Sequence, residues 1–324
     1  MMKSFYHFSA KTVDEAVKLL KDYKGRAKLI AGGTDLLGTL KDRIAKEYPE
    51  AIINIKTISS LDYIKENAEG LKIGALVKLS NLAQSPTVKE TYKVLAEAAY
   101  AVGTPQIRNM GTIGGNLCQD VRCWYYRYPN QIGGRILCPR KGSGHCLAIA
   151  GDNRYHAIME GNKCFAVCPS DTAIALTVLD AKIKILGPKG YRTISVRGFF
   201  KTLGNTLKPY EMVTEIQVPR PSEKARQTFL KFTLRKPVDF AIVSVASVIT
   251  VEGEVCKDAK IGLGAIAPTP IRATKAEQAI KGKAIDAITA AETAEVAVMG
   301  AKPLSMNAYK VEITKTLVKR AILS

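Results

Sequence analysis

The sequence predicts an α+β fold in two domains. Its 324 residues are enough for two domains of ordinary size, each with a buried core. Strand-like and helix-like segments are mixed up to about residue 217, and a segment with two prolines follows at 218–221. Beyond it, three strand-like runs precede three helical patterns, an order typical of an α+β layer rather than of alternating βα units. We therefore expect one domain over residues 1–217 and a second over 218–324.

Periodicity supports each element in turn. Thr12 and Glu15 have the spacing of a capping box, and apolar residues follow at helical intervals before Gly25. Other segments of the first domain are predicted as strands (28–31, 52–58, 71–76 and 182–186) or helices (88–102 and 171–176). In the second domain the predicted strands are 228–234, 241–251 and 259–266, and the predicted helices are 274–280, 287–298 and 309–323.

The chain is strongly basic, with 48 Lys and Arg residues against 29 Asp and Glu and a formal net charge of +19. The basic residues are spread thinly, which favours a solvated surface that attracts anionic partners. No apolar run approaches the roughly 20 residues that a membrane-spanning helix needs. The first 16 residues contain no apolar signal segment, so we expect a cytoplasmic protein.

Six of the seven cysteines lie in one long segment without clear periodicity: Cys118, Cys123, Cys138, Cys146, Cys164 and Cys168. In a reducing compartment, clustered thiols bind metal more often than they form disulfides. The intervals from Cys123 to Cys164 contain no C-x-x-C pair, which argues against zinc knuckles and the ferredoxin pattern. Soft iron prefers thiolates, so a [4Fe–4S] cluster is one interpretation; zinc and inert buried thiols are the others.

Two diglycine loops stand out, at 31–36 and at 112–116. Paired glycines allow backbone N–H groups to approach an anion without obstruction by Cβ. Neither loop fits G-x-G-x-x-G or the Walker A pattern, which disfavours Rossmann and P-loop assignments. The spacing leaves open whether the two loops converge on one diphosphate.

Four segments carry a family resemblance. Leu29–Leu36, Thr112–Asn116, Pro169–Asp171 and Gly264–Arg272 together resemble the FAD-binding medium subunits of the molybdenum hydroxylases, the xanthine dehydrogenase family. The resemblance runs nearly end to end in the same order. It implies an FAD-binding domain of the PCMH or vanillyl-alcohol-oxidase type, made of two α+β subdomains, over 1–217. It also implies a C-terminal domain of antiparallel sheet and helices over 218–324.

The same resemblance implies which residues bind FAD, and it implies no catalytic residue in this chain. Two loops would enclose the pyrophosphate: Leu29, Ile30, Ala31, Gly32, Gly33, Thr34, Asp35 and Leu36 from one side, and Thr112, Ile113, Gly114, Gly115 and Asn116 from the other. Asp171, Val213 and Lys231 would line the flavin. Val102 stands where some relatives carry a large aromatic side chain.

Residues 119–163 resemble an insert of 4-hydroxybenzoyl-CoA reductases and certain bacterial aldehyde oxidoreductases, in which four cysteines bind one [4Fe–4S] cluster. The implied ligands are Cys123, Cys138, Cys146 and Cys164, with Cys168 as the substitute for the last. Cys118 is expected to be a packed thiol. His145, beside Cys146, is a candidate donor to a cluster sulfur, and His156 is expected to order the insert.

The implied function is electron transfer within a heteromeric complex. Electrons would pass between [2Fe–2S] centres of a small partner subunit and an external carrier, while a large molybdopterin-binding subunit acts on the organic substrate. The carrier would be an acidic ferredoxin or flavodoxin, or else NAD. Alternatives are the same subunit without a cluster reducing NAD directly, a stand-alone flavin oxidase, and a zinc-stabilised nucleic-acid-binding protein suggested by the charge. We expect no nucleic-acid partner.

Overall fold

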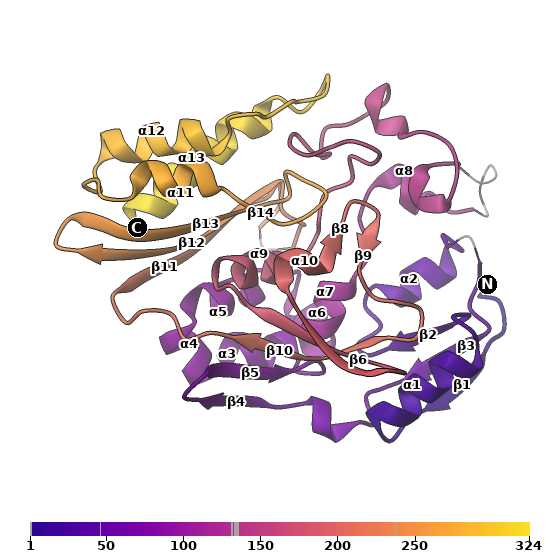
Figure 1. The fold of residues 1–324 in the computed structure, drawn as a ribbon. Helices are drawn as coiled ribbons and strands as arrows, with labels where there is room; N and C mark the ends of the chain where they lie inside the picture. The colour runs from indigo at the N-terminus through magenta and orange to yellow at the C-terminus, as the bar shows by residue number, and fades with distance from the viewer. Residues whose placement is uncertain (1, 46, 131, 133–135, 237) are drawn as a thin grey trace.

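The computed structural model describes residues 2–45, 47–130, 132, 136–236 and 238–324, so residues 131 and 133–135 of the expected insert lie outside the described part. Figure 1 shows the N-terminal strands at one end, the C-terminal helices at the other, and the cysteine-rich segment around helix α8 (Trp124–Arg127) beside them. The chain therefore builds α+β layers around more than one core, as the sequence predicts.

A small parallel sheet begins the fold. Its strands are β1 (Tyr6–Ser9), β3 (Ala51–Asn54) and β2 (Ala27–Ile30), in that order. Helix α1 (Val13–Asp22) packs on this sheet through Ala16, Val17 and Leu20. The predicted helix start is confirmed, because the Thr12 hydroxyl accepts the amide of Glu15 at 3.1 Å. Strand β2 runs directly into the first diglycine loop, which α2 (Leu36–Lys41) follows.

A five-stranded antiparallel sheet forms the centre of the first domain, in the order β4 (Ile64–Asn67), β5 (Gly70–Gly74), β10 (Met212–Val218), β6 (Lys182–Gly187) and β7 (Gly190–Ser195). Strand β10 is the middle strand, yet no pattern in its sequence predicts it. The strand comes from the end of the first domain and pairs with segments far away in the sequence.

Helices cover this sheet: α3 (Leu79–Gln84), α4 (Pro86–Thr91), α5 (Lys93–Tyr100) and α9 (Asp171–Val178). The prediction of a single helix over 88–102 is wrong. The chain breaks at Tyr92, whose φ of −121° and ψ of 45° are not helical. Tyr92 is fully buried and donates to Glu66 at 3.1 Å, so tertiary packing interrupts an otherwise helical pattern.

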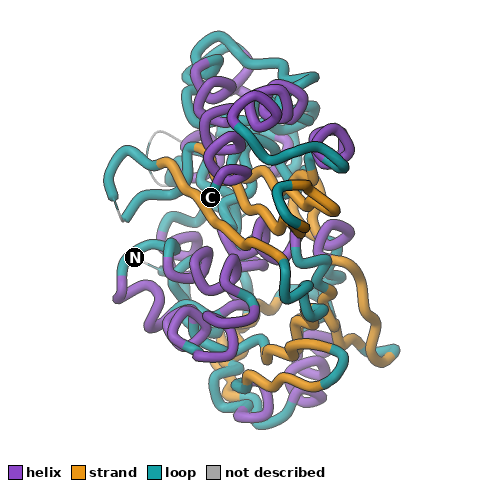
Figure 2. The backbone as a smooth tube through the Cα atoms, turned by 90° about the vertical axis from the view of Figure 1, so that its left-hand side faces the viewer, coloured by secondary structure: helices purple, strands orange, loops and turns teal. Residues whose placement is uncertain are grey.

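The C-terminal layer agrees with the sequence prediction. Strands β11 (Ala225–Phe232), β12 (Val243–Glu252), β13 (Val255–Gly264) and β14 (Ile271–Arg272) form an antiparallel sheet. Helices α11 (Thr274–Ile280), α12 (Ala287–Ala297) and α13 (Tyr309–Leu323) follow, and Figure 2 shows helices outside these strands. Helices α5 and α9 of the first domain also pack on the sheet, so the two parts share an interface.

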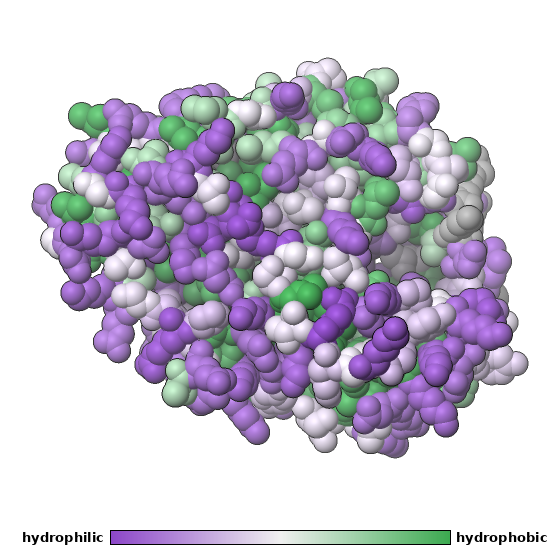
Figure 3. All heavy atoms as spheres, in the orientation of Figure 1, coloured by the Kyte–Doolittle hydropathy of each residue, from purple (hydrophilic) through white to green (hydrophobic). Residues whose placement is uncertain are grey.

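The remaining elements are short. They are η1 (Ser59–Leu61), α6 (Pro105–Met110), α7 (Ile113–Cys118), η2 (Pro139–Lys141), η3 (Leu147–Ile149), α10 (Val196–Phe199), β8 (Phe200–Lys201) and β9 (Gly204–Asn205). On the face shown in Figure 3, hydrophilic residues predominate and hydrophobic residues form separate small patches. None of the helices in the described part of the chain is long and apolar enough to cross a membrane.

Candidate flavin site and cysteine cluster

The two diglycine loops converge, which the sequence left open. Gly32 packs so closely on the chain before the second loop that a Cβ at this position would lie 1.9 Å from the Met110 carbonyl oxygen. The same Cβ would lie 3.1 Å from the Gly111 Cα. Real Cβ atoms do not approach a carbonyl so closely, so only glycine allows this contact. The close approach of the two loops therefore requires glycine at position 32.

The first loop offers backbone donors. Gly33 turns the chain with a φ of +74°, a conformation that glycine adopts without strain. Among the described residues, the amides of Gly32, Gly33, Thr34 and Asp35 donate to no protein acceptor. Unpaired amides on a glycine turn are the usual donors to a phosphate oxygen. The loop predicted to hold the pyrophosphate thus has free N–H groups, whereas Leu29 and Ile30 belong to β2 and Leu36 begins α2.

The amides of the second loop already have acceptors within the protein. The N–H groups of Ile113 and Gly114 donate to the carbonyls of Val77 and Ala75 at 2.9 and 3.0 Å. The amide of Gly115 donates to the Thr112 hydroxyl at 3.1 Å. This loop therefore contributes close packing beside the first loop.

A buried polar network connects the second loop to the Pro-Ser-Asp segment. The Asn116 Oδ1 atom accepts hydrogen bonds from the hydroxyls of Ser170 and Thr172, both at 2.6 Å. The Ser170 hydroxyl also caps α9 through the Ala173 amide. These bonds fix the position of Asp171, the first residue of α9, relative to the second loop.

Asp171 and Lys231, both predicted to line the flavin, form a buried ion pair across the domain interface. Lys231 Nζ lies 2.7 Å from Asp171 Oδ2 and 2.8 Å from the Ala101 carbonyl oxygen. Burial raises the pKa of the Asp171 carboxyl, and the Lys231 ammonium counteracts this effect. Val102 follows Ala101, and both Val102 and Val213 on β10 belong to the apolar core. The structure thus brings Asp171, Lys231 and Val102 to one region.

Asp35 connects the first loop to the cysteine-rich segment. Its Oδ1 atom lies 2.6 Å from Arg127 Nη2 and 3.0 Å from Arg122 Nη1. Its Oδ2 atom accepts the Asp120 amide at 2.7 Å. The carboxylate is therefore directed at two arginines of the segment and neutralised by them. Sequence reasoning did not single out these arginines, because they stand 87 and 92 residues from Asp35 and belong to no motif.

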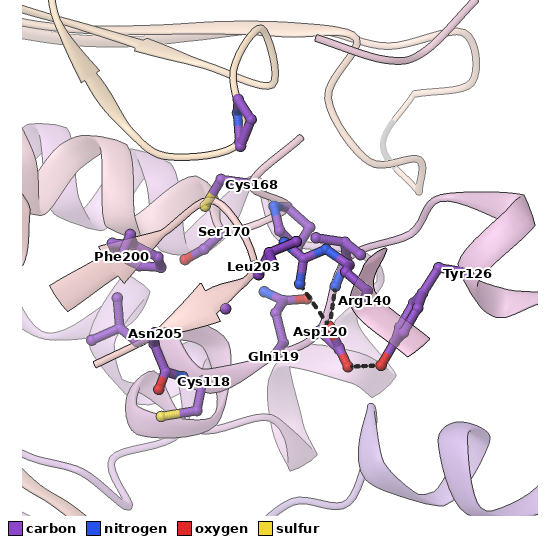
Figure 4. Close-up of a pocket in the computed structure, with 15 residues that line it drawn as sticks. Cys118, Gln119, Asp120, Tyr126, Arg140, Cys168, Ser170, Phe200, Leu203 and Asn205 are labelled. Atoms are coloured by element: carbon purple, nitrogen blue, oxygen red, sulfur yellow. Dashed lines mark hydrogen bonds and ion pairs between the residues drawn. The ribbon is translucent and has the colours of Figure 1, made fainter. Parts of the chain in front are cut away.

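A polar cavity of about 240 Å³ lies beside this connection (Figure 4). Arg140 pairs there with Asp120 at 3.5 Å and donates to the Thr202 carbonyl at 2.8 Å. The Tyr126 hydroxyl also donates to Asp120. The other residues of the wall are Leu117, Cys118, Gln119, Val121, Cys168, Pro169, Ser170, Phe200, Leu203, Gly204, Asn205 and Pro268. A second cavity, of about 490 Å³, contains none of the predicted site residues.

The predicted cysteine ligands gather in one part of the structure. Cys138 and Cys164 belong to a small buried cluster with Val121 and Tyr126, and Cys123 packs against it. Burial raises the pKa of the Cys123 thiol to about 11, and negative charge on Cys164 and Cys146 raises it further. Burial likewise raises the pKa of Cys146, with smaller contributions from Cys164 and Cys138. Each of the four thiols therefore lies near at least one of the others.

Backbone amides oppose this burial. The N–H groups of Tyr125 and Tyr126 lower the pKa of Cys123, and those of Phe165 and Ala148 lower that of Cys146. Such donors stabilise thiolates. Within the described ranges, no three His, Cys, Asp or Glu side chains are arranged to hold a single metal ion.

The other cysteines and the histidines differ from the cluster. Cys168 is buried, and the charges that affect its pKa are those of Asp171 and Arg140 rather than of other cysteines. Cys118 at the end of α7 is not fully packed, because it is accessible on the wall of the cavity, although burial raises the pKa of its thiol to about 12. His145 is also exposed, and in the described structure no hydrogen bond joins it to a cysteine. His156 does contact a cysteine, at a distance of 3.2 Å from Cys123 Sγ.

Comparison with known proteins covers nearly the whole chain. Residues 3–221 match the family of the FAD-binding domain in molybdopterin dehydrogenase, and residues 228–324 match the CO dehydrogenase flavoprotein C-terminal domain. The aldehyde oxidoreductase FAD-binding subunit PaoB of Escherichia coli is 35% identical over 285 residues, which are 85% of this chain and 86% of that protein. The carbon monoxide dehydrogenase medium chain of Hydrogenophaga pseudoflava is 31% identical over 324 residues, 98% of this chain and 96% of that one.

Solved structures agree. Carbon monoxide dehydrogenase from Hydrogenophaga pseudoflava, lacking the Mo-pyranopterin moiety of its cofactor, superposes with a TM-score of 0.80 at 29% identity, over 99% of this chain and 97% of that one. Both the family matches and the fold therefore identify the chain as an oxidoreductase subunit. The chain belongs to the family of FAD-binding medium subunits of the molybdenum hydroxylases.

Proposed function

We propose that this chain is an FAD- and [4Fe–4S]-binding subunit that passes electrons between [2Fe–2S] centres of a small partner and an external carrier. FAD supplies the conversion between electron pairs and single electrons. The observation that carries the proposal is the Asp35 contact, because it joins the loop with free amides to the segment with four neighbouring thiols. The residues on both sides of this contact have the chemistry that the two cofactors need.

The flavin part is supported by the donors of the first loop. The amides of Gly32 to Asp35 would hold the pyrophosphate, because they are the unpaired backbone donors beside the converging glycines. Asp171 and Lys231 would line the part of the site that holds the flavin ring. Both charges are buried there, and each compensates the other. Asn116 contributes by fixing the Asp171 segment through its two hydroxyl contacts.

The cluster part is supported by the donor set. Four neighbouring thiols, two of which (Cys123 and Cys146) have backbone amide donors, suit iron and sulfide, and soft thiolates are the usual ligands of such clusters. In a mononuclear zinc site the ligand sulfurs lie roughly 3.8 Å apart, because each is about 2.3 Å from one ion. A cubane bonds each thiolate to a different iron, so its ligands stand farther apart. Cys123, Cys138, Cys146 and Cys164 would each bind one iron of such a cluster.

The partners follow from the relatives. The similar chains are named as subunits of an aldehyde oxidoreductase and of a carbon monoxide dehydrogenase, so this chain would act beside a large molybdopterin-binding subunit and a small [2Fe–2S] subunit. No substrate-converting group is needed here, since the chain's own residues would position cofactors rather than attack a substrate.

The external carrier we propose is an acidic ferredoxin or flavodoxin. The formal charge of +19 would steer such a partner, and its rate of reaction would fall as salt rises. NAD is the alternative carrier. Rapid reduction of the complex by NADH, with little dependence on salt, would favour it.

Metal and flavin analysis of the complete complex tests the proposal. We expect wild-type complex, purified without oxygen, to contain one flavin per medium subunit. Replacing Cys164 by Ser should remove about four iron atoms and the corresponding EPR signal. Cys168→Ser is the matched control, because Cys168 is as buried as Cys164 but lies near Asp171 and Arg140 rather than near the other thiols. This variant should keep its iron.

Three outcomes would contradict the proposal or one of its assignments. Wild-type complex whose iron is fully accounted for by the [2Fe–2S] centres would leave a cluster-free flavoprotein. Loss of iron from Cys168→Ser but not from Cys164→Ser would move the fourth ligand to Cys168. A complex with no flavin would remove the function altogether.

A further inference from the structure

His156 meets Cys123 although the two residues are 33 positions apart in the sequence. Its Nε2 atom lies 3.2 Å from Cys123 Sγ, and the side chain is 2% exposed. The ring packs edge-on against Trp124, with 5.5 Å between ring centres, and it lies 6.0 Å from the ring of Tyr125. The imidazole is therefore enclosed, with one nitrogen directed at the sulfur.

The hydrogen on this imidazole has one good acceptor. A neutral imidazole carries one N–H, on either Nδ1 or Nε2. Nδ1 is buried without a hydrogen-bond partner in the described structure. A proton on Nε2 can be donated to the Cys123 sulfur, whereas a proton on Nδ1 would have no acceptor. The Nε2–H form is thus the more stable one.

The C-terminal domain holds His156 in this position. The carbonyl oxygen of His156 accepts hydrogen bonds from Lys310 Nζ at 3.0 Å and from Asn307 Nδ2 at 3.2 Å. Its amide donates to the Asn153 carbonyl at 2.9 Å. Asn153, Asn307 and Lys310 are all fully buried, so the backbone of His156 is fixed from both sides. A ring attached to such a backbone keeps its distance from the sulfur.

No competing side chain has this role in the described part of the molecule. The hydrogen bond from His156 is the single side-chain contact of this kind to Cys123, Cys138, Cys146 or Cys164 there. His145, which the sequence suggested, is exposed beside Cys146. The position of the ring rather than its nearness in sequence identifies the donor.

We propose that His156 is a positioning residue for the iron–sulfur centre, donating its Nε2–H to the Cys123 thiolate. The inference rests on the proposed function, because it requires a cluster on these cysteines. A hydrogen bond to a ligand sulfur offsets part of the negative charge that reduction adds, so it favours the reduced state and raises the reduction potential. His156 would thereby set how readily the centre accepts an electron.

A redox titration of the complete complex, followed by EPR, tests this inference. In His156→Phe, which keeps a ring but no donor, we expect the equilibrium constant for reduction of the cluster to fall about tenfold, a shift of 59 mV for one electron. In His156→Gln, whose amide can still donate, the potential should stay closer to that of the wild type. His145→Phe is the matched control and should leave the potential unchanged.

The outcomes separate the two proposals. If the wild-type complex contains no iron beyond its [2Fe–2S] centres, the proposed function fails and this inference fails with it. If the cluster is present and its potential is the same in wild type and His156→Phe, only the inference is overturned. Should His156→Phe lose its iron, pulsed EPR of ¹⁵N-histidine-labelled complex decides. A histidine coupling to the reduced cluster in wild type that is absent from His156→Gln supports the inference, and no such coupling in wild type refutes it.

Discussion

The Asp171–Lys231 pair illustrates what a single residue does at this site. Both side chains are buried, at 9% exposure for Lys231 and 6% for Asp171, and they come from different domains. Such a pair stabilises the protein little compared with an apolar pair of the same size, but removing one partner leaves an uncompensated charge in the interior. The pair is therefore sensitive to single substitutions at either end.

We expect Lys231→Met to destabilise the protein by about 3–5 kcal/mol and to reduce its flavin content, because Asp171 then loses its partner. Urea unfolding and the ratio of flavin to protein absorbance measure the two effects. Lys224→Met is the matched control, since Lys224 is 69% exposed in its pair with Glu252 and should change stability by less than about 0.5 kcal/mol. Equal effects of the two substitutions would show that the buried pair contributes no more to stability and flavin binding than the exposed pair.

At the scale of the structural element, the contact between the two diglycine loops depends on Gly32. We expect Gly32→Ala to push the first loop away from Met110, to lower the flavin content and to destabilise the fold by about 1–3 kcal/mol. Gly38→Ala in α2 is the control, because a Cβ there meets nothing within 4 Å and a helix gains roughly 0.5–1 kcal/mol from the exchange. Flavin titration and thermal unfolding of both variants check this, and a Gly32→Ala variant with full flavin would contradict the proposed contact.

Elements with a long, regular pattern could be predicted from the sequence, and elements made by distant pairing could not. Helices α11 to α13 and strands β11 to β13 have their own periodicity, so they lie close to where the pattern predicts them. Strand β10 was missed because its identity depends on partners elsewhere in the chain. The same limit holds at the site: the glycine loops were visible as motifs, whereas the arginines that neutralise Asp35 stand 87 and 92 positions away and share no pattern with it.

At the scale of the whole molecule, the C-terminal helix α13 fixes the cysteine-rich segment. Lys310, which is fully buried, donates to the Ala265 carbonyl at 2.5 Å and to the His156 carbonyl at 3.0 Å. Asn307, just before the helix, donates to the carbonyls of Asn153, His156 and Ala157. The second domain and the cysteine segment are thus connected through buried polar contacts, so we expect them to unfold together.

The burial of Lys310 makes the stability of the protein depend on pH. Burial lowers the pKa of Lys310 to about 7, below its value of 10.5 in an unfolded chain. Between these values the unfolded state binds more protons, so stability rises with pH from about 7 towards 10.5 and is lost as pH falls. The unfolding free energy of wild type relative to Lys310→Met should therefore increase by about 3 kcal/mol between pH 7 and pH 10. Urea titrations at both values test this, and a constant difference would contradict it.

The carboxylate of Asp35 has a consequence for how the protein is assembled. Because it joins the turn with free amides to the segment with the thiols, whatever rigidifies one of them also rigidifies the other. With the proposed flavin and cluster both bound, thermodynamic reciprocity would require each to increase the affinity for the other by the same factor. If the proposed cluster forms on these thiols, maturation would be cooperative, and a complex assembled without iron would bind its flavin more weakly.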